Sequence, residues 1–586
     1  MNQTNTPNKH AHSNKKNRTQ IFSITTVFVL SLSTTNVFAS PASTKLTSSA
    51  EQKTIKHYDI PSIDLDIPEI NWQPCETRPA PFECAQVDVP LSYSPYDRSD
   101  KTTSIALARY PASDPEQKIG SILLNPGGPG GSGVNFVLNA GPFLFSPQVR
   151  EKFDLIGFDP RGIGASNPLQ CFTSAEEQEK ALASPAEPTE FEAILEKRKA
   201  DKFFAKLCRK NGGDIFKHMS TADVARDMDL LRQALGEEKL NFVGYSYGSY
   251  LGTTYANMFP DNFRTIVVDG VLDPIAWSTG RYNERFYLPV TTRLKSDVGS
   301  MDTLNEFFRL CDENPQTCFF SGNSAARFDA IIQKLKVEPL EIELSSGELF
   351  VLTHIDFLGI TTSTLYSTIS WPFYSALLAD IESRQAPKQI ATQLENLVRK
   401  LGIEDRIFSD KLPQSAEGFV GVLCSDSSNP RDYFAWPFAA EYSNMQNGYF
   451  GSGWTWASSP CRFWKPAKNR YVGPFNKITD QPILVASTLF DPATPYHGAQ
   501  IVAGLMPKAK LLTVESWGHT TPFLSSCGDE VTANYLLTGE LPAAKNTICP
   551  TNFTPFETLT DQRQQLQKDQ QSNREKLVKA LLKSNR

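Results

Sequence analysis

The sequence predicts an α/β fold: a doubly wound, mostly parallel sheet interrupted by a largely helical insertion. Two observations support this prediction. Between residues 103 and 269, short apolar stretches that end in glycine- or aspartate-containing loops alternate with segments of helical periodicity, which is typical of strand–helix–strand units. The apolar stretches then stop over residues 275–475 and resume at residues 482–486 and 511–515. One sheet built from two separated parts of the chain accounts for both observations.

The first part of the predicted sheet begins with an edge hairpin at residues 72–90, where apolar and polar residues alternate. A short strand starts at Asn241, and an amphipathic helix precedes it over residues 221–235, with Ser220 or Thr221 placed to cap that helix. The other strands are expected at residues 103–110, 120–124, 153–158 and 265–268.

Residues 275–475 are rich in aromatic residues, and helices are expected within them at residues 303–311, 324–335, 355–380 and 391–401. An insertion between the strands of such a sheet lies over their carboxyl ends, where this architecture keeps its active site. We therefore expect a cap that shapes a substrate pocket. The full division is a signal peptide (1–39), an extended lead-in (40–70), the two parts of the core (71–274 and 476–550), the cap insertion (275–475) and a polar helical tail (551–586), expected to be a solvated appendage.

The amino-terminal segment has the pattern of a secretory signal peptide. Residues 1–20 are polar and basic, residues 21–32 are mostly apolar, and Val37 and Ala39 are small residues suited to a cleavage site. The apolar run is short for a membrane span, so an uncleaved anchor is the less favoured alternative. Cleavage removes four basic and no acidic residues, which changes the net charge from −6 to −10. This negative charge argues against a nucleic-acid partner. From the signal-peptide pattern we expect a secreted or periplasmic protein without a stable membrane anchor.

All ten cysteines lie in the part of the chain that follows the signal peptide, and export favours disulfide bonds. A zinc site is the competing interpretation, but no two cysteines have C-x-x-C spacing and no histidine lies within four residues of a cysteine. We expect no metal and no cofactor. The sequence does not fix the connectivity; in the most local arrangement each cysteine pairs with the next one along the chain. The cysteines are Cys75, Cys84, Cys171, Cys208, Cys311, Cys318, Cys424, Cys461, Cys527 and Cys549.

Residues 244–248, GYSYG, follow the strand that starts at Asn241 and precede a helical pattern. This is G-x-S-x-G in a strand–turn–helix context, where a strained turn exposes the serine hydroxyl above the sheet. Glycines two residues before and after Ser246 are needed because a Cβ atom there would clash with the neighbouring strand and helix. Ser246 is therefore the candidate nucleophile, and an inert serine in an ordinary turn is the alternative.

A serine nucleophile needs a base within hydrogen-bond reach. His519 follows a predicted strand in the loop SWGHT, which places it at the carboxyl end of the sheet with Ser246, whereas His497 begins a helix and is better placed to pack. The carboxylate that orients the base is expected on the loop after the preceding strand, where Asp491 stands; Asp269 is the alternative. The order Ser, Asp, His along the chain is that of the α/β-hydrolase fold.

A tetrahedral oxyanion needs fixed donors. One should be the backbone N–H of Tyr247, directly after the nucleophile. The second should come from the glycine-rich loop NPGGPGGSG that follows residue 124, with Gly128 preferred and Gly127 second. A phosphate-binding loop is excluded because no lysine follows at the required spacing.

Several segments occur together in this chain: NPGGPGGSG, GFDPRGIGASNPLQC, TADVARDMDLLRQALG, NFVGYSYGSYLGTTYANMFP, VVDGVLDP, FDPATP and WGH. As a set they closely resemble the secreted tripeptidyl aminopeptidases, serine peptidases of the α/β-hydrolase fold that are related to the prolyl aminopeptidases. Pro126 stands where the prolyl enzymes usually have a histidine, as in the tripeptidyl branch. The resemblance implies a triad of Ser246, Asp491 and His519 and the removal of short peptides from a free amino terminus. Members of the same family have been assigned esterase activity, so a carboxylesterase is the alternative.

An aminopeptidase must also recognise the ammonium group of its substrate, and a charge that enters a partly desolvated pocket needs a partner. We expect a cap carboxylate about 10 Å from Ser246, the length of a tripeptide. The candidates are Asp426, beside Cys424, together with Glu284 and Glu441, and the sequence does not choose among them. A surface or turn role is equally compatible with Asp426. A non-enzymatic binding protein is the least favoured interpretation, because the nucleophile, base, acid and oxyanion loop are all present.

Overall fold

The computed structural model describes residues 66–76, 78–94, 100–182, 186–408, 415–557 and 564–584, and every contact given below refers to them. The expected signal peptide and most of the expected lead-in lie outside these residues. Within the described ranges, no helix is both long and apolar enough to cross a membrane.

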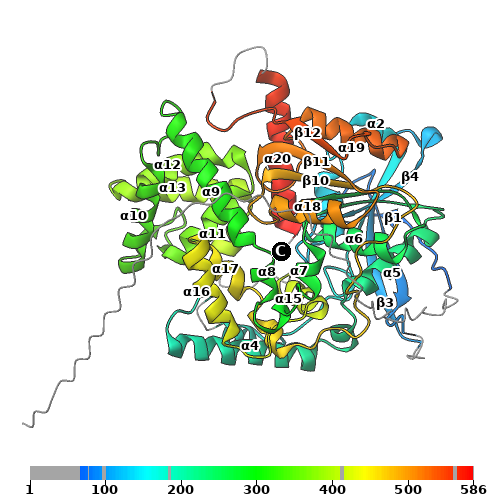
Figure 1. The fold of residues 1–586 in the computed structure, drawn as a ribbon, viewed down its shortest axis with the longest axis horizontal. Helices are drawn as coiled ribbons and strands as arrows, with labels where there is room; N and C mark the ends of the chain where they lie inside the picture. Colours follow the sequence, from blue (N-terminus) through cyan, green and yellow to red (C-terminus); the bar gives the residue numbers. More distant parts are fainter. Residues whose placement is uncertain are drawn as a thin grey trace, which may run out of the picture. The chain divides into compact units, whose positions relative to one another are not determined.

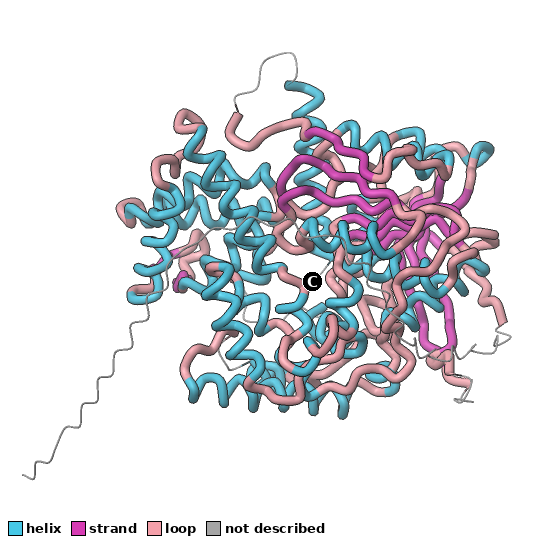
Figure 2. The backbone as a smooth tube through the Cα atoms, viewed as in Figure 1, coloured by secondary structure: helices cyan, strands magenta, loops and turns pink. Residues whose placement is uncertain are grey.

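The core is a ten-stranded sheet with the order β1-β2-β3-β5-β4-β6-β7-β10-β11-β12 (Figures 1 and 2). Pairing is antiparallel from β1 to β5 and parallel from β5 to β12, which confirms the doubly wound, mostly parallel sheet. The strands are β1 (Gln73–Pro74), β2 (Glu83–Pro90), β3 (Thr102–Tyr110), β4 (Gly120–Asn125), β5 (Phe153–Phe158), β6 (Leu240–Tyr245), β7 (Phe263–Asp269), β10 (Leu484–Phe490), β11 (Lys510–Trp517) and β12 (Asn546–Pro550).

The central strands are apolar throughout because helices cover both faces of the sheet. Neighbouring residues of β4 point to opposite sides: Leu123 belongs to the core under α5, α6 and α18, whereas Ile122 and Leu124 belong to the core under α1, α19 and α20. These helices are α1 (Gly133–Ala140), α5 (Thr221–Ala234), α6 (Tyr247–Met258), α18 (Tyr496–Leu505), α19 (Ser526–Thr538) and α20 (Gln564–Ser584), and α2 (Pro147–Lys152) precedes β5.

A long, mainly helical segment lies between β7 and β10, and Figure 2 shows its helices apart from the strands of the main sheet. It has an apolar core of its own. Its elements are α7 (Pro274–Ser278), η3 (Glu284–Phe286), α8 (Val290–Arg293), α9 (Ser296–Glu313), α10 (Ser324–Val337), β8 (Leu340–Glu343), β9 (Leu349–Leu352), α11 (His354–Leu365), η4 (Thr368–Ser370), α12 (Trp371–Ser383), α13 (Pro387–Leu401), α14 (Glu404–Ile407), α15 (Ser415–Asp426), α16 (Ala435–Asn447), α17 (Gly451–Trp456) and η5 (Ser459–Phe463).

The structure differs from the expected elements in several places, among them the strands β8, β9 and β12, which were not expected. The single helix expected over residues 355–380 is two helices, because Pro372 stands in the first turn of α12 and a proline is not tolerated in a helix interior. A second helical segment precedes α5 and was not expected from the sequence. It contains α3 (Ala175–Leu182), α4 (Phe191–Asn211) and η2 (Asp214–Lys217).

The ten cysteines form five disulfide bonds, each between two consecutive cysteines, which is the most local of the possible arrangements. The pairs are Cys75–Cys84, Cys171–Cys208, Cys311–Cys318, Cys424–Cys461 and Cys527–Cys549. The fourth pair ties α15 to η5 within the inserted segment.

The carboxyl-terminal helix α20 is not the solvated appendage that its charged sequence suggests (Figure 1, red). Leu577 and Leu581 are buried in the core of the sheet, and Val578 and Leu582 are buried in the core of the inserted helices. These residues form an apolar stripe at helical spacing, which the high average polarity of the segment conceals. The helix therefore joins the two cores.

Candidate active site

Ser246 stands between β6 and α6 with φ 56° and ψ −122°, a conformation that is rare for a residue with a side chain. Its N–H donates to the carbonyl oxygen of Asp269 at 2.8 Å. The flanking glycines are required by space: a Cβ atom on Gly244 would lie 2.2 Å from the Gly248 oxygen, and one on Gly248 would lie 2.7 Å from the Asn125 oxygen. The turn thus has the geometry expected of a nucleophile elbow.

His519 lies on the loop that follows β11, and its Nδ1 is 2.9 Å from both carboxylate oxygens of Asp491. Both side chains are buried. Asp491 also accepts hydrogen bonds from the N–H groups of Ala493 and Thr494, at 2.9 and 2.8 Å, so its orientation is fixed by its own loop. The contact with Asp491 leaves Nε2 as the ring nitrogen available for a reacting group.

The electrostatics favour an ionised Asp491. Burial alone would raise the pKa of this carboxyl, but the charge and hydrogen bond of His519, together with the N–H groups of Thr494 and Ala493, hold the pKa below its ordinary value. Asp269, the alternative acid, instead accepts hydrogen bonds from the N–H and hydroxyl of Thr521, at 3.0 and 2.7 Å. Burial raises the pKa of Asp269 to about 6, and the bonds from Thr521 offset that rise only in part.

The glycine-rich loop after β4 packs directly against the elbow. A Cβ atom on Gly127 would lie 2.7 Å from the Cβ of Ser246, so only glycine fits there. Gly127 donates its N–H to the side-chain oxygen of Asn125 at 3.0 Å, whereas the next residue, Gly128, lines the cavity in front of Ser246. Tyr247 is the first residue of α6, so its N–H has no partner within the helix. The glycine-rich loop therefore lies against the amino terminus of α6, where the Tyr247 N–H has no helical partner.

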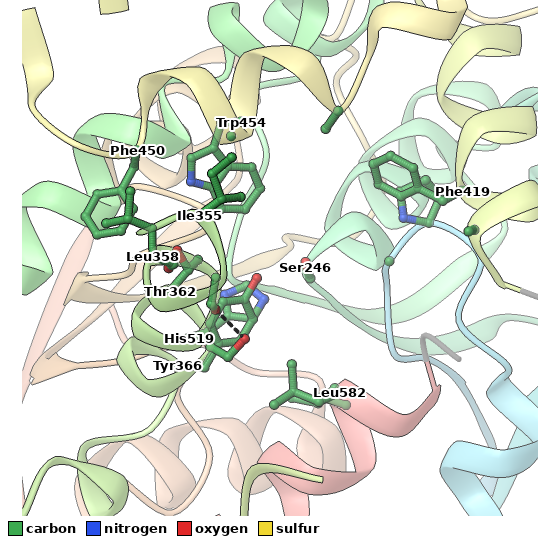
Figure 3. Close-up of a pocket in the computed structure, with 18 of the residues that line it drawn as sticks. Ser246, Ile355, Leu358, Thr362, Tyr366, Phe419, Phe450, Trp454, His519 and Leu582 are labelled. Carbon is green, nitrogen blue, oxygen red and sulfur yellow. Dashed lines mark hydrogen bonds between the residues drawn. The ribbon is translucent and has the colours of Figure 1, made fainter. Parts of the chain in front are cut away.

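Ser246 and His519 line one cavity of about 480 Å³ (Figure 3). Most of its wall comes from the inserted helices and is apolar or aromatic, as the labelled side chains in Figure 3 show. Two leucines of α20, Leu581 and Leu582, complete the wall. A site of this size and lining suits a small organic molecule or a short peptide with apolar side chains.

Glu187, a carboxylate that was not among the candidates from the sequence, lines this cavity. It lies just before α4, and its carboxylate is close enough to Gly453 that a Cβ atom there would be 3.0 Å from Oε1. Burial raises the pKa of Glu187, and a hydrogen bond from Ser452 offsets this only in part. No local pattern marks Glu187 in the sequence, because its position depends on packing against a helix more than 260 residues away in the chain.

None of the three carboxylates expected to bind the substrate amine lines the cavity. Asp426 is buried and accepts hydrogen bonds from Thr221 and from the indole N–H of Trp277, the latter at 3.1 Å. Glu284 accepts from the N–H of Arg281 and lines a different cavity, and Glu441 is exposed on α16. The hydrogen bonds of Asp426 hold α15 against α5 and α7, so its carboxylate is already engaged within the protein.

Comparison with known proteins gives matches to two family models. The one described as "TAP-like protein" matches residues 447–549, which contain Asp491 and His519, and the one described as "alpha/beta hydrolase fold" matches residues 120–311, which contain Ser246. The chain therefore has the α/β-hydrolase fold and is similar to the TAP-like family in its carboxyl-terminal part. It is a TAP-like serine hydrolase in this sense, and the two matches lie on either side of most of the inserted helices.

The curated relatives of this TAP-like hydrolase cover most of its length. Serine protease Hip1 of Mycobacterium tuberculosis is 29% identical over 493 residues, which are 81% of this chain and 89% of the relative. The tripeptidyl aminopeptidase of Streptomyces lividans is 28% identical over 500 residues, 83% and 87% of the two chains. Carboxylesterase B of M. tuberculosis is 29% identical over 512 residues, 84% and 92% of the two chains. The relatives thus include both peptidases and an esterase.

Proposed function

We propose that this TAP-like hydrolase is an exported serine aminopeptidase that releases short peptides, tripeptides above all, from the free amino terminus of its substrates. Ser246 is the nucleophile, His519 the general base and Asp491 the carboxylate that orients the base. The N–H groups of Tyr247 and Gly128 form the oxyanion hole. Gly127, the second choice from the sequence, has its N–H engaged by Asn125 and serves to let the loop approach Ser246.

In the proposed reaction, His519 Nε2 removes the hydroxyl proton of Ser246 as its oxygen attacks the scissile carbonyl carbon. The resulting oxyanion accepts hydrogen bonds from the two backbone amides. The imidazolium then gives its proton to the leaving amine, the carbon–nitrogen bond breaks, and the amino-terminal fragment remains as an ester on Ser246. A water molecule, deprotonated by the same imidazole, attacks this ester and releases the fragment as a carboxylic acid.

The presence of Glu187 in the cavity of Ser246 is the observation that supports an aminopeptidase rather than another serine hydrolase. A lone carboxylate in a mainly apolar cavity is costly unless a cation joins it, and the raised pKa of Glu187 reflects that cost. The ammonium group of a peptide is such a cation. We therefore assign to Glu187 the role that was expected of Asp426, Glu284 or Glu441.

The disulfide bonds support the proposed location. Five cysteine pairs are at bonding distance, and bonds of this kind persist in oxidising compartments. Together with the signal-peptide pattern of residues 1–39, they favour export to the periplasm or the medium.

A substrate panel tests the proposal. A fluorogenic tripeptidyl amide with a free amine, the same amide with an acetylated amine, and a simple aryl ester are compared for the wild type, Glu187→Gln and the matched control Glu441→Gln. Acetylation should cost the wild type about 2–5 kcal/mol of transition-state binding, as for a charge left unpaired. Glu187→Gln should reduce that penalty and leave ester hydrolysis unchanged, while Glu441→Gln should behave as the wild type.

A carboxylesterase is the second candidate function. The apolar lining of the cavity and the carboxylesterase relative both favour it, and the same three residues would cleave an ester. Equal turnover of the blocked and free amides, or turnover of the ester alone, would contradict the aminopeptidase proposal and favour this alternative or an endopeptidase.

A further inference from the structure

The helix α20 lies at the candidate active site although it is the last described element of the chain. Leu581 and Leu582 line the cavity, and the carbonyl oxygen of Ser584 accepts a hydrogen bond from the N–H of Ser132, the cap residue of α1, at 2.7 Å. Glu575 forms an ion pair with Lys400 of α13 at 2.7 Å. The helix is thus attached both to the sheet side and to the inserted helices.

One residue of this helix, Arg574, is fully buried and points its guanidinium into the loop that carries His519. Its Nη2 donates to the carbonyl oxygen of His519 itself. Its Nη1 donates to the carbonyl oxygen of Pro522 at 3.1 Å and to the hydroxyl of Thr520 at 3.3 Å. A single planar side chain therefore contacts three residues of the loop.

The loop needs such support because its backbone is strained. Thr520 has φ 67° and Phe523 has φ 64°, both in the left-handed region that residues with side chains avoid, and Gly518 has φ 100°. Strained conformations of this kind persist only when the surroundings over-determine them. The N–H of His519 also donates to the carbonyl oxygen of Tyr366, from the inserted helices, at 3.1 Å. Both the N–H and the carbonyl oxygen of His519 therefore have a partner outside the loop.

The charges around Arg574 explain why a buried guanidinium is tolerated there. Burial lowers the pKa of Arg574 to about 10, while the carboxylates of Asp269, Asp491 and Asp529 oppose that fall. The side chain remains a cation at neutral pH and is surrounded by acids that include the one bonded to His519. A lysine at this position would keep the charge but lack the planar fork that reaches several acceptors at once.

We propose that Arg574 is a positioning residue for the general base: its hydrogen bonds to the His519 carbonyl, Thr520 and Pro522 hold the imidazole in line with Ser246. This inference rests on the proposed role of His519. It makes α20 a functional part of the active site, since the helix carries the residue that fixes the base.

The test compares Arg574→Ala and Arg574→Lys with Glu575→Gln, a neighbouring change that removes an ion pair of the same helix without touching the loop. The readouts are kcat and KM for an aryl ester, the labelling rate of Ser246 with a fluorophosphonate, and the melting temperature. The ester is used because its hydrolysis does not depend on recognition of an amine. Methylguanidinium is added to Arg574→Ala to refill the space left by the side chain.

We expect Arg574→Ala to lower kcat and the labelling rate about 100-fold, as for a misplaced catalytic group, with KM unchanged. Methylguanidinium should restore part of the rate, Arg574→Lys should lie between the alanine variant and the wild type, and Glu575→Gln should keep its kcat. If Arg574→Ala does not fold, Arg574→Lys decides the question. Wild-type kcat in a folded variant, or equal losses in Arg574→Ala and Glu575→Gln without rescue, would overturn the proposal. An active His519→Ala variant would instead show that the proposed base is wrong.

Discussion

The carboxylate of Asp426 accepts hydrogen bonds from both the N–H and the hydroxyl of Thr221, at 2.8 and 2.6 Å. Thr221 is the first residue of α5, which packs on the sheet, and Asp426 ends α15 of the inserted segment. The Thr221 hydroxyl is also bonded to the hydroxyl of Tyr247, next to the proposed nucleophile. Asp426 therefore ties the inserted helices to the core directly behind the elbow, and the disulfide at Cys424 holds its helix in place.

Replacing Asp426 with alanine should lower stability rather than change substrate choice. The buried N–H and hydroxyl of Thr221 would lose their acceptor, which costs about 1–3 kcal/mol for each unsatisfied group. Urea denaturation should show a lower free energy of unfolding for Asp426→Ala and no change for Glu441→Ala. The preference for a free over an acetylated tripeptide amide should be the same in all three proteins. A selective loss of that preference in Asp426→Ala would return this residue to the list of amine ligands.

The proposed triad predicts a sharp contrast between two histidines. Ser246→Ala and His519→Ala should each lower kcat by about 10⁴- to 10⁶-fold, because the members of a triad act as a unit. His497 is exposed at the start of α18 and away from the cavity of Ser246, so His497→Ala should retain activity. Steady-state kinetics on the aryl ester measure all three. Loss of activity at His497 alone would refute the assignment of the base.

The two candidate acids can be separated in the same way. Asp491→Asn should lower kcat about 10⁴-fold, since an amide favours the wrong tautomer of the base. Asp269→Asn should have a far smaller effect on kcat, because Asp269 is bonded to Thr521 and not to the imidazole. Pre-steady-state burst experiments would show whether acylation is the step that slows. The opposite ranking would identify Asp269 as the orienting acid.

Asp269 should also contribute a recognisable pH dependence to stability. Its pKa is raised by burial from the ordinary value of 3.8 to about 6 in the folded protein. The folded state therefore binds more protons than the unfolded state between these values, and the contribution of this group to the free energy of unfolding falls as pH rises from 4 to 6. Asp269→Asn removes this fall, on the order of 2 kcal/mol across the window. The free energy of unfolding is measured by urea denaturation at several pH values between about 4 and 6. An equal change with pH in the wild type and in Asp269→Asn would contradict the prediction.

Reduction of the disulfides should destabilise the protein. The two largest loops, closed by Cys171–Cys208 and Cys424–Cys461, each have a sequence separation of 37 residues, and a bond that closes such a loop contributes about 2–4 kcal/mol. The melting temperature should fall in the presence of a reductant. Without reductant, the double variant Cys424→Ser/Cys461→Ser, which lacks one of the bonds, should show a smaller decrease relative to the wild type. Peptide mapping without reduction should recover the five neighbouring pairs. Free thiols throughout the purified protein would contradict this.

The sequence predicted the features that local patterns encode. Ser246 is marked by glycines that the elbow requires, and His519 and Asp491 each follow an apolar strand, so their places at the carboxyl edge of the sheet follow from the strand pattern alone. The inserted helices carry no comparable pattern. They offer several carboxylates, and no sequence feature ranks them as amine ligands. The carboxylate in the cavity, Glu187, comes instead from a segment before α5 and is placed by tertiary packing.

The helix α20 is a second case in which the local sequence did not predict the structure. Its composition is polar and charged, which indicated a solvated tail. The helix is nevertheless buried, because it carries a short apolar stripe and Arg574. Arg574 donates to backbone carbonyl groups, which every residue has, so the sequence does not reveal these partners. Likewise, the break between α11 and α12 depends on Pro372, a single residue in a long helical pattern.

The pairing of Glu187 with an aromatic cavity beside Ser246 matters for inhibitor chemistry. Reagents that attack only an activated serine label many hydrolases, because all of these enzymes have such a serine. A boronate or phosphonate that also carries a primary amine and an apolar side chain would engage three features of this cavity at once. The carboxylate thus offers a means of selectivity that does not depend on the reactive group.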